Sequence, residues 1–302
     1  MHPEAGPANL ACRVPGPIAL RKFRYWPRPK VPRSAVVARV ACSPTSTLGA
    51  VATASSFLRA SAPLAFAHRG GAGEAPENTW AAFEHAISLG FRYMETDVRA
   101  SADGTAVAMH DPRLDRVAAT RGQVRRMTWD QLKCLPLRAG SSIPSLEDLL
   151  GAWPEICWNI DVKESAAIEP VIEALRRTRS AQRVLVAAFS GSRSRMLRKA
   201  FGPEIAIGAG RWAVAALVGA KFAPILGSLA RVDAAQVPPR RGGARIVDSR
   251  FVSSCHRKGL PVHVWTINDA VDMEQLLDLG VDGIMTDRPS VLKAVLEKRG
   301  QW

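Results

Sequence analysis

The stretch Tyr93-Met94-Glu95-Thr96-Asp97-Val98 places two acidic residues inside a run that is otherwise typical of a buried β-strand. Successive side chains of a strand point to opposite faces, so Glu95 and Asp97 share one face and the residues that alternate with them share the other. Two like charges on a closed face are costly unless they pair with cations or bind a metal ion. The stretch therefore predicts a buried polar site inside the fold.

Short apolar runs of the same kind recur from residue 63 onwards and alternate with stretches of helical periodicity. The expected strands are Leu64–Ala67, Tyr93–Val98, Ala106–Met109, Cys157–Val162, Arg183–Phe189, Ile205–Gly208, Val262–Ile267 and Gly283–Thr286, with Val232–Val237 and Arg245–Val247 as further candidates. The expected helices are Thr79–Leu89, Leu146–Trp153, Ala166–Thr178, Ser192–Ala200, Phe251–Lys258 and Val271–Leu279. Strand–helix–strand repetition implies parallel pairing through right-handed crossovers. Eight strands over about 235 residues favour an α/β fold of the closed TIM (β/α)8 barrel type.

Composition separates a basic N-terminal part from the rest of the 302 residues. The formal net charge is +14, and residues 1–66 carry nine Lys and Arg against the single acid Glu4. Residues 1–60 are also rich in proline and lack a periodic apolar pattern, so we expect a disordered basic extension there. With 47% hydrophobic residues the chain has enough apolar material for a large core, and we expect the barrel domain over residues 63–298.

Three interpretations of residues 1–60 stay open. An Arg-rich, acid-poor segment suggests a targeting peptide, although its prolines would interrupt an amphipathic helix. A secretory signal fits less well, because the mildly apolar run Thr47–Leu58 lies far from Met1. The third interpretation is a misassigned start, with translation beginning at a valine such as Val51. Without a convincing signal or an apolar run of about 18 residues, we expect a cytoplasmic protein with no transmembrane segment.

Polar residues also follow other expected strands at their carboxyl ends, where barrel enzymes build their active sites. His68-Arg69 follow the first strand and His110-Asp111 follow the third, while Asp161 and Lys163 share one face at the end of the fourth. Carboxylate oxygens suit a hard divalent ion, Mg²⁺ or Ca²⁺, and the Lys and Arg suit the oxygens of a phosphate. Two histidines suit a reaction that needs one base and one acid.

In these residues the chain resembles the glycerophosphodiester phosphodiesterases, in the order and spacing of that family from about residue 63 to 297. The motifs that carry the resemblance are Ala67-His68-Arg69-Gly70, Pro76-Glu77-Asn78-Thr79, Glu95-Thr96-Asp97-Val98, His110-Asp111, Ile143-Pro144-Ser145-Leu146-Glu147, Asp161-Val162-Lys163, Val264-Trp265-Thr266-Ile267-Asn268 and Gly280-Val281-Asp282-Gly283-Ile284-Met285-Thr286-Asp287-Arg288-Pro289. The resemblance implies a TIM-type barrel with a short insertion after the third strand, about residues 111–144. It also implies hydrolysis of a glycerophosphodiester to glycerol 3-phosphate and an alcohol.

The family's functional residues map onto this sequence one by one. The two motif histidines, His68 and His110, correspond to the general acid and base. The resemblance implies a divalent metal held by Glu95, Asp97 and Asp161, and substrate contacts from Arg69, Lys163 and Trp265. The fourth-strand acid is usually Glu in the family and is Asp161 here, which reaches one methylene less far.

Two other functions are weighed against this one. A lysophospholipase D-like phosphodiesterase acting on lipids is suggested by the apolar stretch Trp212–Leu229, which also fits an ordinary barrel helix. Binding to an anionic surface or to nucleic acid is suggested by Tyr25 and Trp26 among the arginines of the extension. The remainder of the chain carries no recognised nucleic-acid motif, so the expected partner is a small glycerophosphodiester and no nucleic acid. The sequence leaves the oligomeric state open.

Overall fold

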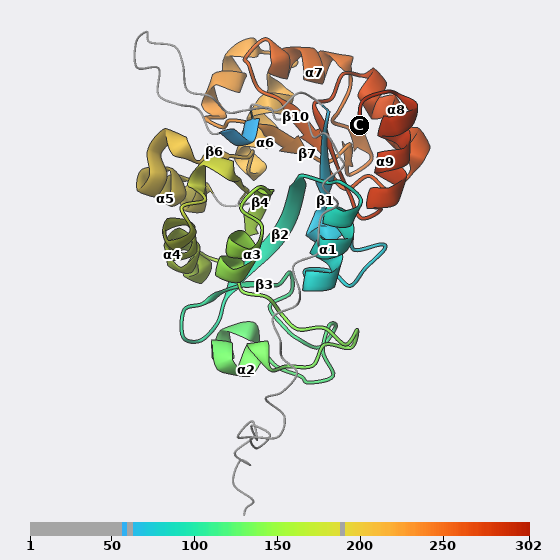
Figure 1. Cartoon of the computed structure of the whole chain (residues 1–302). Helices are drawn as coiled ribbons and strands as arrows, with labels where there is room; N and C mark the ends of the chain where they lie inside the picture. The colour runs from blue at the N-terminus through green and yellow to red at the C-terminus, as the bar shows by residue number, and fades with distance from the viewer. Residues whose placement is uncertain (1–55, 59–62, 188–190) are drawn as a thin grey trace, which may run out of the picture. The chain divides into compact units, whose positions relative to one another are not determined.

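The protein is described by a computed structural model that covers residues 56–58, 63–187 and 191–302 (Figure 1). Its strands are β1 Leu64–Ala67, β2 Tyr93–Ala100, β3 Ala106–Ala108, β4 Cys157–Val162, β5 Val184–Ala187, β6 Ala206–Ile207, β7 Ala235–Val237, β8 Arg240–Arg241, β9 Ala244–Arg245, β10 Val262–Val264 and β11 Gly283–Thr286. Its α-helices are α1 Trp80–Ser88, α2 Trp129–Lys133, α3 Leu146–Ala152, α4 Ile168–Thr178, α5 Gly191–Phe201, α6 Arg211–Gly219, α7 Ser249–His256, α8 Ala270–Asp278 and α9 Pro289–Lys298.

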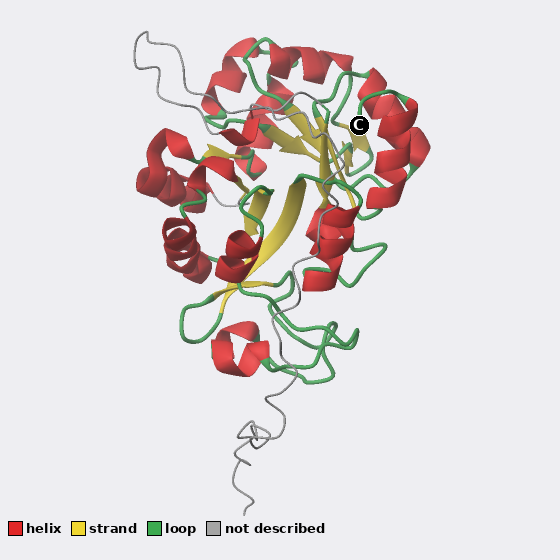
Figure 2. Ribbon diagram, viewed as in Figure 1, coloured by secondary structure: helices red, strands yellow, loops and turns green. Residues whose placement is uncertain are grey.

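Parallel strands form the centre of the fold, in the order β6-β5-β4-β2-β1-β11-β10-β7. The two ends of this order meet through an isolated parallel bridge between Gly208, directly after β6, and Ala234, directly before β7. Figure 2 shows the helices arranged around these strands, as right-handed crossovers between parallel strands require. The predicted TIM-type barrel is confirmed.

One of the eight expected barrel strands was assigned wrongly. The segment Ala106–Ala108 forms β3, which pairs antiparallel with the end of β2 and lies outside the barrel order. Only residues 101–105 separate the two strands, a connection long enough for a hairpin and too short for a helical crossover. The eighth barrel strand is instead β7, within the candidate stretch Val232–Val237, and its neighbour is β10.

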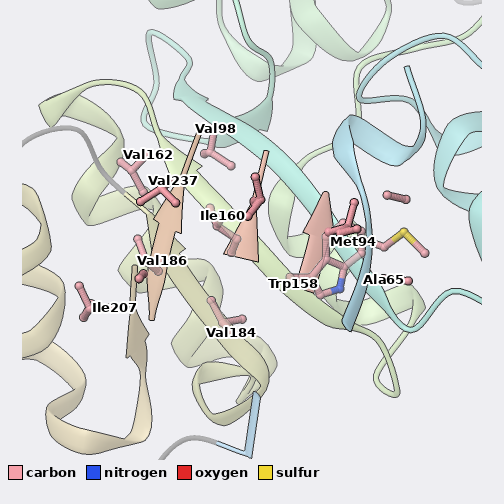
Figure 3. Close-up of a cluster of buried hydrophobic side chains, with 14 of the residues drawn as sticks. Ala65, Met94, Val98, Trp158, Ile160, Val162, Val184, Val186, Ile207 and Val237 are labelled. Carbon is pink, nitrogen blue, oxygen red and sulfur yellow. The ribbon is translucent and has the colours of Figure 1, made fainter. Parts of the chain in front are cut away.

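Alternate side chains of the barrel strands pack on two faces, one toward the surrounding helices and one toward the inside of the barrel. Met94 belongs to the large buried cluster that also holds residues of the surrounding helices, and Figure 3 shows it among the strand residues of that cluster. Phe66 and Tyr93 belong to a second buried cluster on the opposite, inward side of the same strands. By the period of two, Glu95 and Asp97 share the inward face with Tyr93, as the sequence predicted.

Phe57 contributes to the inward cluster from a segment that the sequence assigned to the extension. It lies in a short 3-10 turn, Ser56–Leu58, and its ring centroid is 5.2 Å from that of Tyr93 and 6.1 Å from that of Phe66. The Tyr93 hydroxyl donates a hydrogen bond of 3.1 Å to the Phe57 carbonyl oxygen. The rest of the expected extension, apart from residues 56–58, lies outside the described residues.

The insertion between β3 and α3 has a small core of its own. Leu114, Val124, Leu132 and Ile143 are buried there together with Val107 of β3. The short helix α2 in this region begins with a capping box in which Thr128 and Gln131 bond each other's backbone. None of the helices in the part of the chain that the structure describes combines the length and the apolar character of a membrane span.

The core around Trp158 offers a test of packing. Its indole is fully buried 5.0 Å from the Phe83 ring, and its Nε1–H has no hydrogen-bond partner among the described residues. We expect Trp158→Ala to lower the free energy of unfolding by about 3–5 kcal/mol through the cavity that it leaves. Trp158→Phe keeps a ring and removes the unpaired N–H, so it should cost about 2 kcal/mol or less. Urea unfolding followed by far-ultraviolet circular dichroism measures the stability of both variants. Equal losses of stability would contradict the conclusion that the Trp158 ring stabilises the core by filling it.

His263 predicts a pH dependence of stability. Its ring is fully buried beside Phe66, and burial outweighs the opposing charge of Asp282 and lowers the pKa of His263 from 6.5 to about 4. The unfolded chain therefore takes up a proton near pH 6.5, whereas the folded chain takes it up only near pH 4. The free energy of unfolding should fall by about 3 kcal/mol from this group as the pH drops through that window. In His263→Leu this decrease in the free energy of unfolding should be missing. A variant whose stability depends on pH in the same way as the wild type would contradict the prediction.

Candidate active site

One cavity of about 220 Å³ collects every residue that the sequence predicted for the site. Its lining includes His68, Arg69, Glu95, Asp97, His110, Asp161, Lys163 and Trp265. Three polar residues without a predicted role, Asn159, Gln236 and Thr266, also line it. Most of these residues lie on or just after barrel strands at their carboxyl ends, so the barrel brings distant parts of the sequence to one place.

The first strand ends in a tight 3-10 turn, His68–Gly70, which contains two of the residues that the sequence predicted for the site. Arg69 adopts a positive φ of 51°, which is unusual for a residue with a Cβ and is typical of functional sites. A Cβ on Gly70 would lie 2.7 Å from the Cβ of Ala82 on α1, so only glycine fits at that position. The turn directs the backbone N–H of Arg69 to Glu95 Oε2 at 2.9 Å.

His68 is held by a carboxylate that directly follows the neighbouring strand β11. Its Nδ1–H donates to Asp287 Oδ1 at 2.6 Å, and Asp287 Oδ2 in turn accepts a 2.9 Å hydrogen bond from Asn268 Nδ2. The second ring nitrogen, Nε2, lies 3.7 Å from Glu95 Oε2. Burial alone would lower the pKa of His68, but the carboxylates of Glu95 and Asp287 outweigh it and raise the pKa above 6.5.

His110 has an equivalent arrangement built from the insertion. Its Nδ1–H donates to Asp111 Oδ1 at 2.7 Å, and Arg116 Nε donates to Asp111 Oδ2 at 2.6 Å. Arg116 also forms two hydrogen bonds of 2.7 Å with Glu77, whose oxygens lie 3.3 Å from Arg69 Nη1. Despite partial burial, Arg116 and His110 lower the pKa of Asp111 to about 2, so this carboxylate is ionised at neutral pH.

Opposite charges surround the inward acids of β2 and β4. Asp97 pairs in register with Asp161, and Lys163 Nζ lies 2.6 Å from a carboxylate oxygen of each. Arg69 Nε approaches Asp97 Oδ2 to 3.0 Å. Although burial opposes ionisation, Lys163 and Arg69 lower the pKa of Asp97. Burial and the nearby Asp97 raise the pKa of Glu95 to about 7, and burial also raises the pKa of Asp161.

The predicted metal ligands are close but not gathered into a closed site. Across residues 56–58, 63–187 and 191–302, no three His, Cys, Asp or Glu side chains form a group that could enclose a metal ion. The Lys163 ammonium lies between Asp97 and Asp161, while Glu95 faces His68 and the backbone of Arg69. One oxygen of Asp161, Oδ1, is buried without a hydrogen-bond partner among the described residues.

Several residues that shape the cavity had no predicted role. Asp287 and Asn268 belong to motifs that carried the resemblance, and both follow barrel strands, a position that could have marked them as partners of His68. Glu77 had a position near the site without a role, and its bonds to Arg69 and Arg116 now supply one. The sequence did not mark Arg116 as a site residue, because its partner Glu77 lies 39 residues away in a different loop.

Comparisons with known proteins show which family the chain belongs to. Residues 68–291 match the family described as "Glycerophosphoryl diester phosphodiesterase family". The "Probable glycerophosphodiester phosphodiesterase 2" of Mycobacterium tuberculosis is 41% identical over 254 residues, 82% of this chain and 95% of that protein. The "Glycerophosphodiester phosphodiesterase" of Caldanaerobacter subterraneus is 30% identical over 78% of this chain and 99% of its own length.

A solved structure extends the similarity to the fold. The crystal structure of glycerophosphodiester phosphodiesterase from Agrobacterium tumefaciens superposes with a TM-score of 0.64 at 26% identity, over 78% of this chain and 99% of the other. The family match covers well over half of the sequence and includes both histidines and all three acids of the cavity. The chain belongs to the glycerophosphoryl diester phosphodiesterase family and is a phosphoric diester hydrolase.

Proposed function

We propose that the chain hydrolyses a glycerophosphodiester to glycerol 3-phosphate and an alcohol, with His68 and His110 as the acid–base pair and a divalent metal ion as cofactor. One observation carries the proposal: each histidine binds a carboxylate through Nδ1, Asp287 in one case and Asp111 in the other, and both line one cavity. A carboxylate at Nδ1 fixes the tautomer and orientation of the ring, which leaves Nε2 for the substrate.

The two histidines divide the proton transfers of the reaction. One Nε2 takes the proton from the attacking oxygen, which is either the 2-hydroxyl of the glycerol or a water molecule. The new P–O bond forms as the bond to the alcohol breaks, and the other histidine gives a proton to the departing alkoxide. If the hydroxyl attacks, a cyclic phosphate forms first and water opens it in a second step. Each histidine is expected to contribute about 10²–10⁴-fold to the rate.

Arg69 and Lys163 are the cations placed to meet the phosphate. Both line the cavity and both contact Asp97, so their positive charges are already held in place when the substrate arrives. Fixed charges of this kind stabilise the negative charge that builds on the phosphoryl oxygens. Trp265, at the far end of β10, forms a half-buried wall of the same cavity and would limit the position of the alcohol.

The acids of the cavity fit a hard divalent cation. Glu95, Asp97 and Asp161 supply only carboxylate oxygens, and the buried Asp161 Oδ1 has no partner among the described residues. The raised pKa values of Glu95 and Asp161 indicate that the carboxylates are not fully compensated by the neighbouring cations. These three residues would hold Mg²⁺ or Ca²⁺, which prefer oxygen ligands. When bound, the ion would withdraw charge from the phosphate oxygens.

The role of His110 can be tested by substitution. His110→Ala should keep the fold, because the side chain is about one-third exposed, and should lower turnover of glycerophosphocholine by about 100-fold or more. Asp111→Asn keeps the size of the partner and removes its charge, so a smaller loss is expected. His256→Ala is the matched control, since His256 also bonds a carboxylate, Asp282 at 2.7 Å, without lining the cavity. Turnover of the His110 variant within about tenfold of wild type would contradict the proposal.

Metal dependence has a separate test. Dialysis against EDTA should reduce turnover by about 100-fold or more, and adding Mg²⁺ or Ca²⁺ should restore it. Glu95→Gln should need a higher metal concentration for half-maximal rate, because a charged ligand is lost. Glu164→Gln serves as the control, because Glu164 pairs with Arg99 and does not line the cavity. Full turnover in EDTA would refute the metal while leaving the acid–base proposal intact.

A further inference from the structure

Large apolar side chains are gathered on the outside of α6 and of the 3-10 segment η8, Pro224–Leu229, that follows it. Trp212 is 84% exposed, Phe222 81%, Ile225 77% and Leu229 69%, and Leu226 adds a smaller area. We call these five residues the apolar ridge. Single exposed apolar residues are ordinary on protein surfaces, but a cluster of this kind usually marks an interaction site.

The ridge is one surface and not two separate ends of a helix. The segment η8 folds back along α6, so that a Cβ placed on Gly219 would lie 2.9 Å from Leu226 Cδ1. Trp212 at the start of α6 and Leu229 at the end of η8 line the same cavity of about 680 Å³. The opposite side of α6 is fixed to the barrel through the buried residues Val214 and Leu217.

Positive charge lies beside the ridge, next to Trp212 and Leu229. Residues 191–231 contain seven Lys and Arg and a single acid, Glu204. Within that stretch, Arg198 pairs with Asp233 and Lys221 pairs with Asp248. Four exposed basic residues line the cavity that Trp212 and Leu229 share, and none of the four forms an ion pair with a carboxylate of the described residues: Arg195, Lys199, Arg211 and Arg231.

Arg211, one of these four basic residues, lies close to the catalytic cavity. Arg211 and Val214 of α6 line a further cavity of about 400 Å³, together with Pro238 and the exposed Arg241 of the β8–β9 hairpin. Three residues, Ala209, Gln236 and Trp265, line both this cavity and the catalytic one. A membrane that bound at Arg211 would therefore lie near a cavity that shares three residues with the catalytic one.

We propose that the apolar ridge and its four basic neighbours form a docking surface for an anionic lipid membrane. Exposed aromatic and aliphatic side chains beside Arg and Lys are the combination that inserts into the interface of a bilayer and attracts acidic headgroups. A second copy of the chain fits less well, because it would bring the same positive patch and a net charge of +14 against this surface.

Docking of this kind would bring the catalytic cavity next to glycerophosphodiesters that still carry an acyl chain. That consequence rests on the proposed function, and it would favour the lysophospholipase D-like choice of substrate. The docking itself depends only on the apolar ridge and its four basic neighbours, so it can be measured without any turnover.

Vesicle binding by the full chain tests the proposal. Wild-type protein should co-sediment with vesicles of phosphatidylcholine containing about one-third phosphatidylglycerol, and far less with phosphatidylcholine alone. The ridge variant Trp212→Ala/Phe222→Ala/Ile225→Ala should bind at least about tenfold more weakly. The charge variant Arg195→Gln/Lys199→Gln/Arg231→Gln should weaken binding similarly and flatten its dependence on salt. Val271→Ala, which removes an exposed apolar side chain of α8 (59% exposed) away from the ridge, should bind like wild type.

Each result decides the question. Failure of the wild type to bind the acidic vesicles, or undiminished binding by the ridge variant, would overturn the proposal. So would a ridge variant that changed only the sedimentation coefficient of the free protein, because the ridge would then join copies of the chain. Turnover of water-soluble glycerophosphocholine without vesicles, measured in parallel, should be the same in all variants, since none of the substituted residues lines the catalytic cavity. If the wild type does not turn over glycerophosphocholine, that result would count against the proposed function and not against docking.

Discussion

The structure depends on how two buried carboxylates of one strand are neutralised. Glu95 and Asp97 point into the barrel, where ionised groups are expensive unless cations lie close to them. The tight turn after β1 brings Arg69 to both acids, and the neighbouring strand β4 leads into Lys163. The positions of these cations follow from the backbone. The turn after β1 places Arg69, and the register between β2 and β4 sets Asp97 beside Asp161, next to Lys163. The compensation is incomplete, because the pKa values of Glu95 and Asp161 stay raised, and both residues line the cavity.

Much of the barrel could be predicted from local patterns. The strands β1, β4 and β11 have the predicted bounds, because short apolar runs between turn residues leave few alternatives. The period of two was enough to place Glu95 and Asp97 on one face, and the common polarity of parallel strands was enough to bring them to His68, His110 and Lys163. These inferences needed only the backbone period and the rule that barrel sites form at one rim.

Features that depend on long-range pairing could not be predicted in this way. β3 has the apolar character of a barrel strand, and only its short connection to β2 shows that it forms a hairpin. β7 is three residues long and its neighbour β10 supplies the pairing that defines it. The partner of His68, Asp287, lies 219 residues away, so no local spacing links the two. Side-chain partnerships of this kind are set by the closed barrel and not by nearby sequence.

Because β3 forms a hairpin with β2, the insertion that follows it lies outside the barrel. The insertion packs on its own small core and reaches the cavity through His110 and the guanidinium of Arg116. The loops of the insertion can therefore change in length or composition without disturbing the barrel, as long as His110 and Arg116 keep their contacts. Changes in the insertion would alter what approaches the cavity while His68 and the inward charges stay in place. The barrel and the insertion are thus two packing units that meet at the cavity.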